Sequence, residues 1–456
     1  MTNINMKTNR ITIAPIILLV IIILSSVSTF SASSNNNFFI YSGVDAQENG
    51  SDDNDTSQSL PYVGPNMKGF YTSANTRKDI EGHMPANYYE DSFRLIHDAG
   101  MNHVRFIFYW EAYEKNPSLF LQELDTVAQS AEKYGIKVIY DNHNYQTSSW
   151  LESIANGFPL TLFESNPDRY PYDSGGSIKY ETAKIWWTDW WDRSVKDTNG
   201  NDGWTLLADF LKKIIHALDN YESTLGYEIL SEPQVHSKDQ WEKIGQFNTF
   251  MVDELRKITQ KTIAYSWTVP FELHTPIDVN PENIAKMTPA NKNNVVFKIS
   301  LYGMPEESVF QQNKLETFIE ASQIAGVPLY IGEWNNVRRE LTTTDDGMTI
   351  YKTNPESSDI SQEETTLLVD MFNDLDVFGW AYWKWDLKED KVASFNLITV
   401  VEADGTEEDA TEADETEVDG TEEDATEEDG IMQPTKYFEQ LKNAISTVYG
   451  SSNIIT

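Results

Sequence analysis

The feature that most constrains the fold is a regular alternation of short apolar runs with amphipathic stretches from residue 60 onward. Short β-branched runs predict buried strands, and apolar residues at i, i+3 and i+4 predict helices. The predicted strands are Met67–Tyr71, His103–Phe108, Lys137–Asp141, Leu225–Leu230, Thr262–Trp267, Val295–Ser300, Pro328–Gly332 and Phe378–Trp383. The predicted helices are Tyr88–Ala99, Leu119–Tyr134, Trp204–Tyr221, Trp241–Thr259, Asn313–Ala325, Ser361–Asn373 and Tyr437–Val448.

Eight strands that alternate with helices favour an α/β fold, and specifically a closed (β/α)8 TIM barrel, as a single catalytic domain over residues 60–450. A doubly wound open sheet is the alternative. Such a sheet needs a glycine-rich phosphate turn after its first strand, and the stretch Tyr71–Ala74 contains no glycine.

Residues 1–32 are predicted to be a signal peptide or a membrane anchor. Two basic residues, Lys7 and Arg10, precede the apolar run Ile11–Leu24, and small residues follow it. The run is shorter than the roughly 20 residues that a spanning helix needs, but small residues could extend it, so both alternatives stay open. Residues 33–59 form a predicted polar linker. We therefore expect a protein that is secreted or anchored to the outer face of the cell membrane.

A second segment, residues 402–430, is predicted to be a disordered acidic insertion before the last helix. Glu402–Asp429 holds 16 acidic residues and no Lys or Arg, and an eight-residue unit that begins at Gly405 recurs at Gly420. Self-repulsion and the scarcity of apolar side chains keep such a segment from packing.

Composition excludes several classes of function. The net charge of −38 argues against nucleic-acid binding, which needs a basic surface. The absence of cysteine excludes disulfides and thiolate nucleophiles. The histidines show no metal-binding spacing, and neither a Gly-x-Ser-x-Gly elbow nor a phosphate-binding loop occurs. The sequence therefore predicts no metal site and no cofactor.

Two carboxylates, Glu232 and Glu333, follow the fourth and seventh predicted strands. In a (β/α)8 barrel these positions lie on facing walls of the mouth where active sites are built. Two carboxyl groups about 5–5.5 Å apart are what a retaining glycosidase requires, one as general acid/base and the other as nucleophile.

At this point the sequence resembles glycoside hydrolase family 5, the cellulase family, and its clan. The motifs that carry the resemblance occur in order at predicted strand ends over residues 62–450. They are Val104-Arg105-Phe106, Ile139-Tyr-Asp-Asn-His143-Asn144, Gly226-Tyr-Glu-Ile-Leu-Ser-Glu232-Pro233, Leu329-Tyr-Ile-Gly-Glu333-Trp334 and Gly379-Trp-Ala-Tyr-Trp383.

The resemblance implies that Glu232 is the acid/base and Glu333 the nucleophile. It also implies that Arg105 keeps Glu333 ionised and that Tyr302 donates a hydrogen bond to it. The residues implied in substrate binding are Arg105, His143, Asn144, Ser231, Tyr302, Trp334 and Trp383.

Two positions depart from the family pattern. Ser231 stands where the family usually has Asn, and Ser300 stands where it usually has His. The Asn amide contacts the sugar 2-hydroxyl, which a shorter Ser hydroxyl does not reach in the same way. These departures are consistent with a different sugar beside the nucleophile or with a weakened enzyme.

Ten tryptophans fall near predicted strand ends or in the long connection 144–202, and aromatic faces stack well on sugar rings. Trp186, Trp187, Trp190 and Trp191 also have the three-to-four spacing of a helix's core face, so either role fits them. We expect at least one of the ten to be a sugar platform.

The predicted function is retaining hydrolysis of a β-linked polysaccharide or oligosaccharide, in the manner of an endoglucanase. The alternatives are a catalytically impaired carbohydrate-binding barrel, and a β-mannanase or transglycosylase that uses the same site.

Overall fold

The structure is a computed structural model. It describes residues 60–450 except 74–86, 145–146, 152–155, 173–177, 268, 271–277, 303–308, 337–338, 344–348, 354–360, 387–395 and 402–430. The predicted leader 1–32, the linker 33–59 and the acidic insertion 402–430 lie outside these residues. In the described part, no helix combines the length and apolarity that crossing a bilayer requires.

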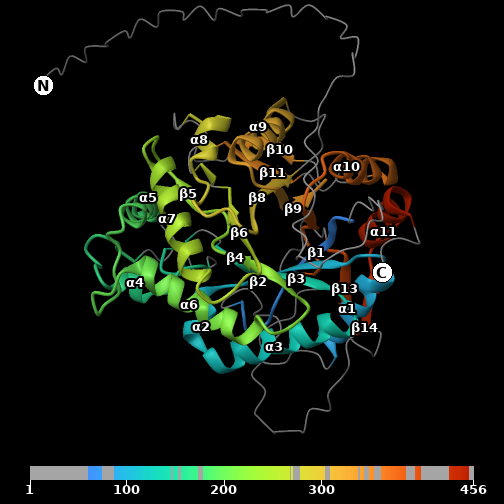
Figure 1. Cartoon of the computed structure of the whole chain (residues 1–456), viewed down its shortest axis with the longest axis horizontal. Helices are drawn as coiled ribbons and strands as arrows, with labels where there is room; N and C mark the ends of the chain where they lie inside the picture. Colours follow the sequence, from blue (N-terminus) through green and yellow to red (C-terminus); the bar gives the residue numbers. More distant parts are fainter. Residues whose placement is uncertain are drawn as a thin grey trace, which may run out of the picture. The chain divides into compact units, whose positions relative to one another are not determined.

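The described chain is built around a closed barrel of eight parallel strands, which confirms the predicted (β/α)8 fold (Figure 1). The order around the barrel is β1-β12-β9-β8-β6-β4-β3-β2. Its strands are β1 (Tyr62–Lys68), β2 (His103–Phe108), β3 (Lys137–Asn142), β4 (Thr224–Glu228), β6 (Thr262–Ser266), β8 (Val295–Tyr302), β9 (Leu329–Asn335) and β12 (Gly379–Tyr382). Because all eight run in the same direction, their carboxyl ends surround one mouth.

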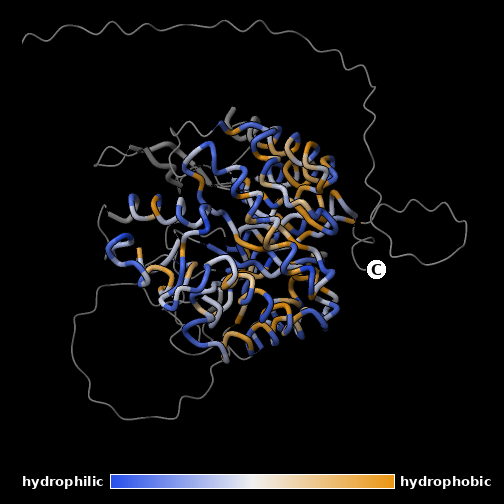
Figure 2. Tube along the Cα trace, turned by 60° about the vertical axis from the view of Figure 1, so that its left-hand side comes forward, coloured by the Kyte–Doolittle hydropathy of each residue, from blue (hydrophilic) through white to orange (hydrophobic). Residues whose placement is uncertain are grey.

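Helices surround the barrel. They are α1 (Tyr88–Asp98), α2 (Trp110–Lys115), α3 (Pro117–Lys133), α4 (Thr161–Glu164), α5 (Ile178–Trp191), α6 (Gly203–Leu218), α7 (Gln240–Leu255), α8 (Pro281–Ala285), α9 (Val309–Ala325), α10 (Gln362–Asp374) and α11 (Lys436–Tyr449). Hydrophilic and hydrophobic residues alternate along these helices (Figure 2), as expected for amphipathic helices that cover a barrel. Among the described residues, three small sheets lie outside the barrel: β5 (Gln234–Val235) with β7 (Val269–Pro270), β10 (Arg339–Thr343) with β11 (Thr349–Thr353), and β13 (Ile398–Val401) with β14 (Ile431–Pro434).

The first strand differs from its predicted position. β1 begins at Tyr62 and ends at Lys68, whereas the sequence predicted Met67–Tyr71. The stretch contains Gly64 and Pro65, which disfavour a strand on propensity alone. Gly64 is needed here because a Cβ at this position would lie 1.7 Å from the carbonyl oxygen of His103 on β2. Close packing between two barrel strands therefore overrides local propensity.

The long connection between β3 and α6 carries α4 and α5, and α5 resolves the open question about the tryptophans. Trp186, Trp187, Trp190 and Trp191 are all at most 2 % exposed. They stack on one another and pack against Phe158, as in the pairs Trp186–Trp190 and Phe158–Trp190. These four tryptophans form a core beneath the connection and are not sugar platforms.

Candidate active site

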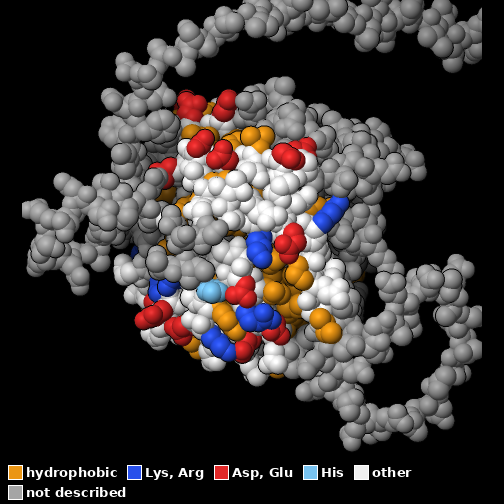
Figure 3. Space-filling model, turned by 90° about the vertical axis from the view of Figure 1, so that its right-hand side faces the viewer, with side chains coloured by type: hydrophobic (Ala, Val, Ile, Leu, Met, Phe, Trp, Pro, Cys, Tyr) orange, Lys and Arg blue, Asp and Glu red, His pale blue; other side chains and the backbone are white. Residues whose placement is uncertain are grey.

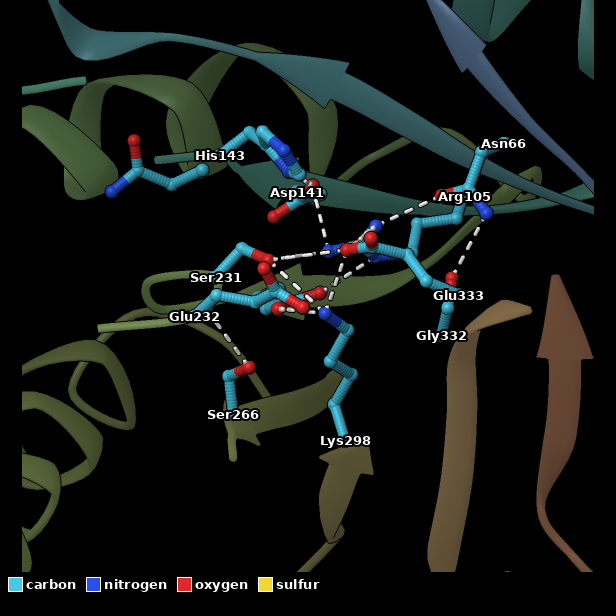
Figure 4. A network of polar contacts seen from close by, with 12 residues as sticks. Asn66, Arg105, Asp141, His143, Ser231, Glu232, Ser266, Lys298, Gly332 and Glu333 are labelled. Atoms are coloured by element: carbon cyan, nitrogen blue, oxygen red, sulfur yellow. Dashed lines mark hydrogen bonds and ion pairs between the residues drawn. The ribbon is translucent and has the colours of Figure 1, made fainter. Parts of the chain in front are cut away.

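Polar side chains from several barrel strands or the turns beyond them converge inside the mouth of the barrel (Figure 4). Arg105 of β2 lies at their centre and is 0 % exposed. Its guanidinium donates to Glu228 at 2.8 Å, to Asn66 at 2.8 Å, to Glu333 at 3.0 Å and to Ser231 at 3.0 Å, and it pairs with Asp141 at 2.8 Å.

The planar fork of Arg105 therefore acts as a template, because each of its nitrogens is directed at a side chain from a different strand or turn. Asn66, on β1, is itself fixed because its amide donates to the carbonyl oxygens of Gly332 at 2.9 Å and Ala381 at 3.0 Å. The orientation of Arg105 is thus tied to the barrel backbone.

Glu333 of β9 accepts hydrogen bonds at both carboxylate oxygens. Oε1 lies 3.0 Å from Arg105 Nη1 and 2.8 Å from the Nζ of Lys298 on β8, and Oε2 accepts from the hydroxyl of Tyr302 at 2.6 Å. The contacts predicted between Glu333 and both Arg105 and Tyr302 are therefore present.

The charge state of Glu333 follows from these neighbours. Burial alone would raise the pKa of Glu333, but attraction to Lys298, and then to Arg105, outweighs it and holds the pKa well below the ordinary value. A carboxylate that stays ionised inside a protein is suited to act as a nucleophile.

The pKa of Glu228 shifts in the opposite direction to that of Glu333. Glu228 ends β4, is fully buried, and burial raises its pKa despite the attraction of Arg105. Its Oε2 accepts from Arg105 Nε at 2.8 Å, while its Oε1 has no hydrogen-bond partner among the described residues. Glu228 therefore orients the arginine from below the mouth and is not placed as a second acid.

Ser231 and Glu232 lie just beyond β4, where the chain leaves the barrel. The backbone N–H of Ser231 donates to the carbonyl oxygen of Asn142 at 3.0 Å, and the amide of Asn142 donates back to Ile229 at 2.9 Å. Glu232 has a positive φ of 44°, and its N–H donates to Ser266 Oγ at 3.1 Å. Glu232 is partly exposed, and Figure 4 shows its side chain directed toward the same group of polar residues as Glu333.

His143 follows β3 and is held from two sides. Its Nδ1 lies 2.7 Å from Asp141 Oδ2, and its ring stacks on Trp383 with centroids 5.8 Å apart. Trp383 is partly exposed, so its ring is open to a ligand. Asn144 is 4 % exposed, and its Oδ1 has no hydrogen-bond partner among the described residues, so its predicted substrate contact stays a prediction.

The predicted role of Trp334 is wrong. Successive side chains of a strand point to opposite faces, so when Glu333 points into the barrel, Trp334 points out of it. Trp334 is 1 % exposed and packs edge-on against Phe372 of α10, Trp380 and Tyr382. Its ring belongs to the layer between the barrel and the helices.

Sequence reasoning missed Lys298, Asp141, Glu228 and Asn66 as members of the site. A signal was present for Lys298 and Glu228, because each is a charged residue inside an otherwise apolar strand. Such a residue is stable only when it is paired, which points to a buried network. Nothing in the local pattern around Asn66 marks it.

The comparison with known families decides the classification. The model of the family described as "Cellulase (glycosyl hydrolase family 5)" matches residues 60–389, which include the whole polar network. The chain belongs to glycosyl hydrolase family 5.

Similar proteins from this family include enzymes named for glycolipids. An endoglycoceramidase of Cyanea nozakii is 25 % identical over 181 residues, which cover 34 % of this chain and 35 % of that protein. The match thus spans about a third of the relative's length. A crystal structure of an endogalactoceramidase superposes with a TM-score of 0.52 at 16 % identity, and covers 72 % of this chain and 71 % of that one. Endo-glycoceramidase II from Rhodococcus sp. gives 0.50 at 17 % identity, with 72 % and 74 % covered.

The described residues on the face shown in Figure 3 are mixed in charge. On the face shown in Figure 3, basic side chains lie among acidic ones and around an apolar area, so the described part of this face has no continuous basic surface. The described residues also contain no group of three or more His, Asp or Glu that could hold a metal ion.

Proposed function

We propose that this family 5 protein is a retaining glycosidase that cleaves a β-glycosidic bond by double displacement, with Glu333 as nucleophile and Glu232 as acid/base. The observation that carries the proposal is the state of Glu333. Its carboxylate is buried and is kept ionised by two cations at 2.8 and 3.0 Å, beside a second, partly exposed glutamate.

The assignment of nucleophile and acid/base follows from the surroundings of each carboxyl group. Of the two Glu333 oxygens, Oε1 is held by Lys298 and Arg105, whereas Oε2 meets the single hydroxyl of Tyr302 among the described residues. Oε2 is thus the oxygen free to attack the anomeric carbon. Glu232, on the opposite wall, protonates the leaving oxygen and then activates the incoming water.

The first substrate class is a β-linked polysaccharide or oligosaccharide. A glycosphingolipid is the second candidate, favoured by the sequence match to the endoglycoceramidase of Cyanea nozakii. Both classes present a β-linked sugar to the nucleophile and differ in the group that leaves, so the same two glutamates serve both.

The test uses the wild-type protein with Glu333→Gln and Glu232→Gln. Each protein is assayed on aryl β-glycosides, β-glucans, β-mannans and lactosylceramide, and proton NMR records the anomer released first. Wild type should release the β-anomer from at least one substrate. Glu333→Gln should lose on the order of 10³-fold or more on every substrate.

Glu232→Gln should lose about 10²–10⁴-fold on substrates with poor leaving groups and much less on an activated aryl glycoside, which needs no proton. Glu242→Gln, on an exposed residue of α7, is the matched control and should keep full activity. Release of the α-anomer would overturn the retaining mechanism. Glycan binding without product from any substrate would favour the carbohydrate-binding alternative, and transfer to sugar acceptors would favour the transglycosylase.

A further inference from the structure

Lys298 occupies an unusual position for a lysine, at the centre of a barrel strand and 0 % exposed. Its Nζ lies 2.8 Å from Glu333 Oε1, 3.0 Å from Ser300 Oγ and 3.1 Å from Ser231 Oγ. A lysine ammonium has three donors, and these three acceptors use all of them. Burial of an ammonium is costly unless it is fully paired, so this arrangement is built as a unit.

The two serines that Lys298 contacts are the two positions at which the sequence departs from the family pattern. Ser231 and Ser300 come from different parts of the chain, beyond β4 and on β8, yet both present a short hydroxyl to the same ammonium. Both departures from the family pattern therefore meet at one residue, Lys298.

The backbone of β9 also accommodates this lysine. A Cβ added at Gly332 would lie 2.6 Å from Lys298 Cγ and 2.8 Å from its Cε. The side chain of Lys298 thus runs across a position without a side chain, directly before Glu333. This packing restricts where the ammonium can lie.

The hydrogen bonds around Ser231 determine what its hydroxyl can do. Its oxygen accepts from Arg105 Nη2 at 3.0 Å and from Lys298 Nζ at 3.1 Å. Neither cation can accept a hydrogen bond, and a hydroxyl oxygen has two lone pairs, so the Ser231 hydrogen must donate. Its acceptor in this structure is Glu333 Oε1 at 3.4 Å, which is a long bond.

We propose that Lys298 is a positioning residue that, together with Ser231, replaces an amide donor: it holds Glu333 in place and turns the Ser231 hydroxyl hydrogen toward the sugar hydroxyl next to the anomeric carbon. This inference rests on the proposed function for the identity of the ligand. The effect of Lys298 on Glu333 is a property of the protein without substrate, so it can be measured without turnover.

The first measurement is therefore made without substrate. Carbon-13 NMR of protein labelled at the Glu carboxyl carbons, with Glu333→Gln for assignment, follows the ionisation of Glu333 in wild type, Lys298→Met and Lys137→Met. Lys137 begins β3 at the opposite end of the barrel, where its Nζ donates to the Glu222 carbonyl oxygen. The groups around Glu333 that remain in all three proteins are Arg105, Asp141, His143, Glu228, Glu232 and Tyr302.

The pKa of Glu333 should rise by about one pH unit or more in Lys298→Met and stay unchanged in Lys137→Met. An unchanged pKa in Lys298→Met would overturn the proposal. If the loss of the buried charge prevents folding, Ser300→Ala replaces it, because this variant removes one acceptor from Lys298 and leaves the charge in place. Ser300→Ala should also raise the pKa of Glu333, but by a smaller amount than Lys298→Met. An unchanged pKa of Glu333 in Ser300→Ala would count equally against the proposal.

The second measurement tests the donor role of Ser231. Binding of a monosaccharide iminosugar inhibitor is compared with that of its analogue without the hydroxyl next to the anomeric position, in wild type, Ser231→Ala and Lys298→Met. Wild type should prefer the hydroxylated inhibitor by about 10-fold, which corresponds to one hydrogen bond of about 1.4 kcal/mol. Both variants should lose this preference, and the double variant should lose no more than either single one.

The two proposals fail in different ways. Wild type that cleaves no glycoside, with the pKa of Glu333 still shifted in Lys298→Met, would sink the proposed hydrolysis and leave the role of Lys298 standing. An active wild type whose preference for the hydroxylated inhibitor survives in Lys298→Met would sink the inference and leave the hydrolysis standing.

Discussion

The side-chain oxygen of Ser266, at the end of β6, accepts a hydrogen bond from the backbone N–H of Glu232 at 3.1 Å. Glu232 has a positive φ of 44°, which a residue with a side chain adopts only at a cost of about 1–3 kcal/mol. The contact joins the turn beyond β4 to the neighbouring strand. It therefore fixes the backbone from which the proposed acid/base extends.

Ser266→Ala should lower kcat on a substrate with a poor leaving group by about 10-fold and leave KM nearly unchanged, because a misplaced acid acts on the transition state. The orphaned N–H should also lower the free energy of unfolding by about 1–3 kcal/mol. Ser223→Ala is the control, since the buried Ser223 Oγ donates to the Ala128 carbonyl oxygen at the amino-terminal end of β4. It should destabilise the protein without changing kcat, and equal losses of kcat in both variants would contradict the prediction.

A buried histidine should make the barrel sensitive to acid. His103 is 0 % exposed, with Nδ1 2.8 Å from the Lys137 carbonyl oxygen and Nε2 2.7 Å from the Tyr330 hydroxyl. Burial lowers the pKa of His103 from 6.5 to about 3. As the pH falls below 6.5, His103 becomes protonated in the unfolded chain but stays neutral in the folded barrel. The contribution of neutral His103 to the free energy of unfolding is therefore fully present above pH 6.5 and is lost progressively toward pH 3.

This loss should reach about 1.4 kcal/mol per pH unit and should be absent in His103→Gln. Urea denaturation at pH 7, 6, 5 and 4 measures the slope for wild type, His103→Gln and His216→Gln, where His216 is an exposed residue of α6. His216→Gln should retain the wild-type slope. A slope that is the same in His103→Gln and wild type would refute the assignment.

Glu333 should contribute a second acid-dependent component at lower pH. Lys298 and Arg105 hold its pKa below the ordinary value of 4.5 in the folded state despite burial. Its stabilising contribution is therefore complete above about pH 4.5 and is lost as the pH falls through the folded pKa. The difference in unfolding free energy between wild type and Glu333→Gln should be constant from pH 7 to 5 and should shrink below 4.5. A difference that grows on acidification would contradict the sign of the shift.

Truncation of two tryptophans should change different properties, KM for Trp383 and the free energy of unfolding for Trp186. Trp383 is partly exposed and stacks on His143, so Trp383→Ala should raise KM for oligosaccharides by about 10-fold and change the unfolding temperature little. Trp186 is 0 % exposed and stacks on Phe163, so Trp186→Ala should cost about 3–5 kcal/mol of stability. Steady-state kinetics and thermal unfolding on both variants check this, and an unchanged KM in Trp383→Ala would remove it as a sugar platform.

Several elements were predictable because their signal is local. β2 was predicted at His103–Phe108, the range that it occupies, since its valine, isoleucine and two phenylalanines give the short β-branched and aromatic run that is typical of a buried strand. Arg105 and Glu333 were likewise recognisable, because each sits within a strand-end motif. Their contact then follows from the closure of the barrel.

Other features depended on packing between distant segments. Both faces of a parallel barrel strand are buried, so the sequence alone does not tell which strand residues point into the barrel, and Trp334 was assigned to the wrong face. Lys298 looked like an isolated charge in an apolar strand, and its partners Ser231 and Glu333 lie 67 and 35 residues away.

The amino-acid sequence alone determined the order of strands and helices, the amphipathic faces of the helices and the residue types at the strand ends. It did so because hydrophobic periodicity and short motifs act over a few neighbouring residues. The tertiary structure alone decided which of those residues meet. Barrel closure brought Arg105 and Lys298 within 3.0 Å of Glu333, and in that buried, low-dielectric interior the attraction of the two cations for the carboxylate sets the ionisation on which the proposed chemistry depends.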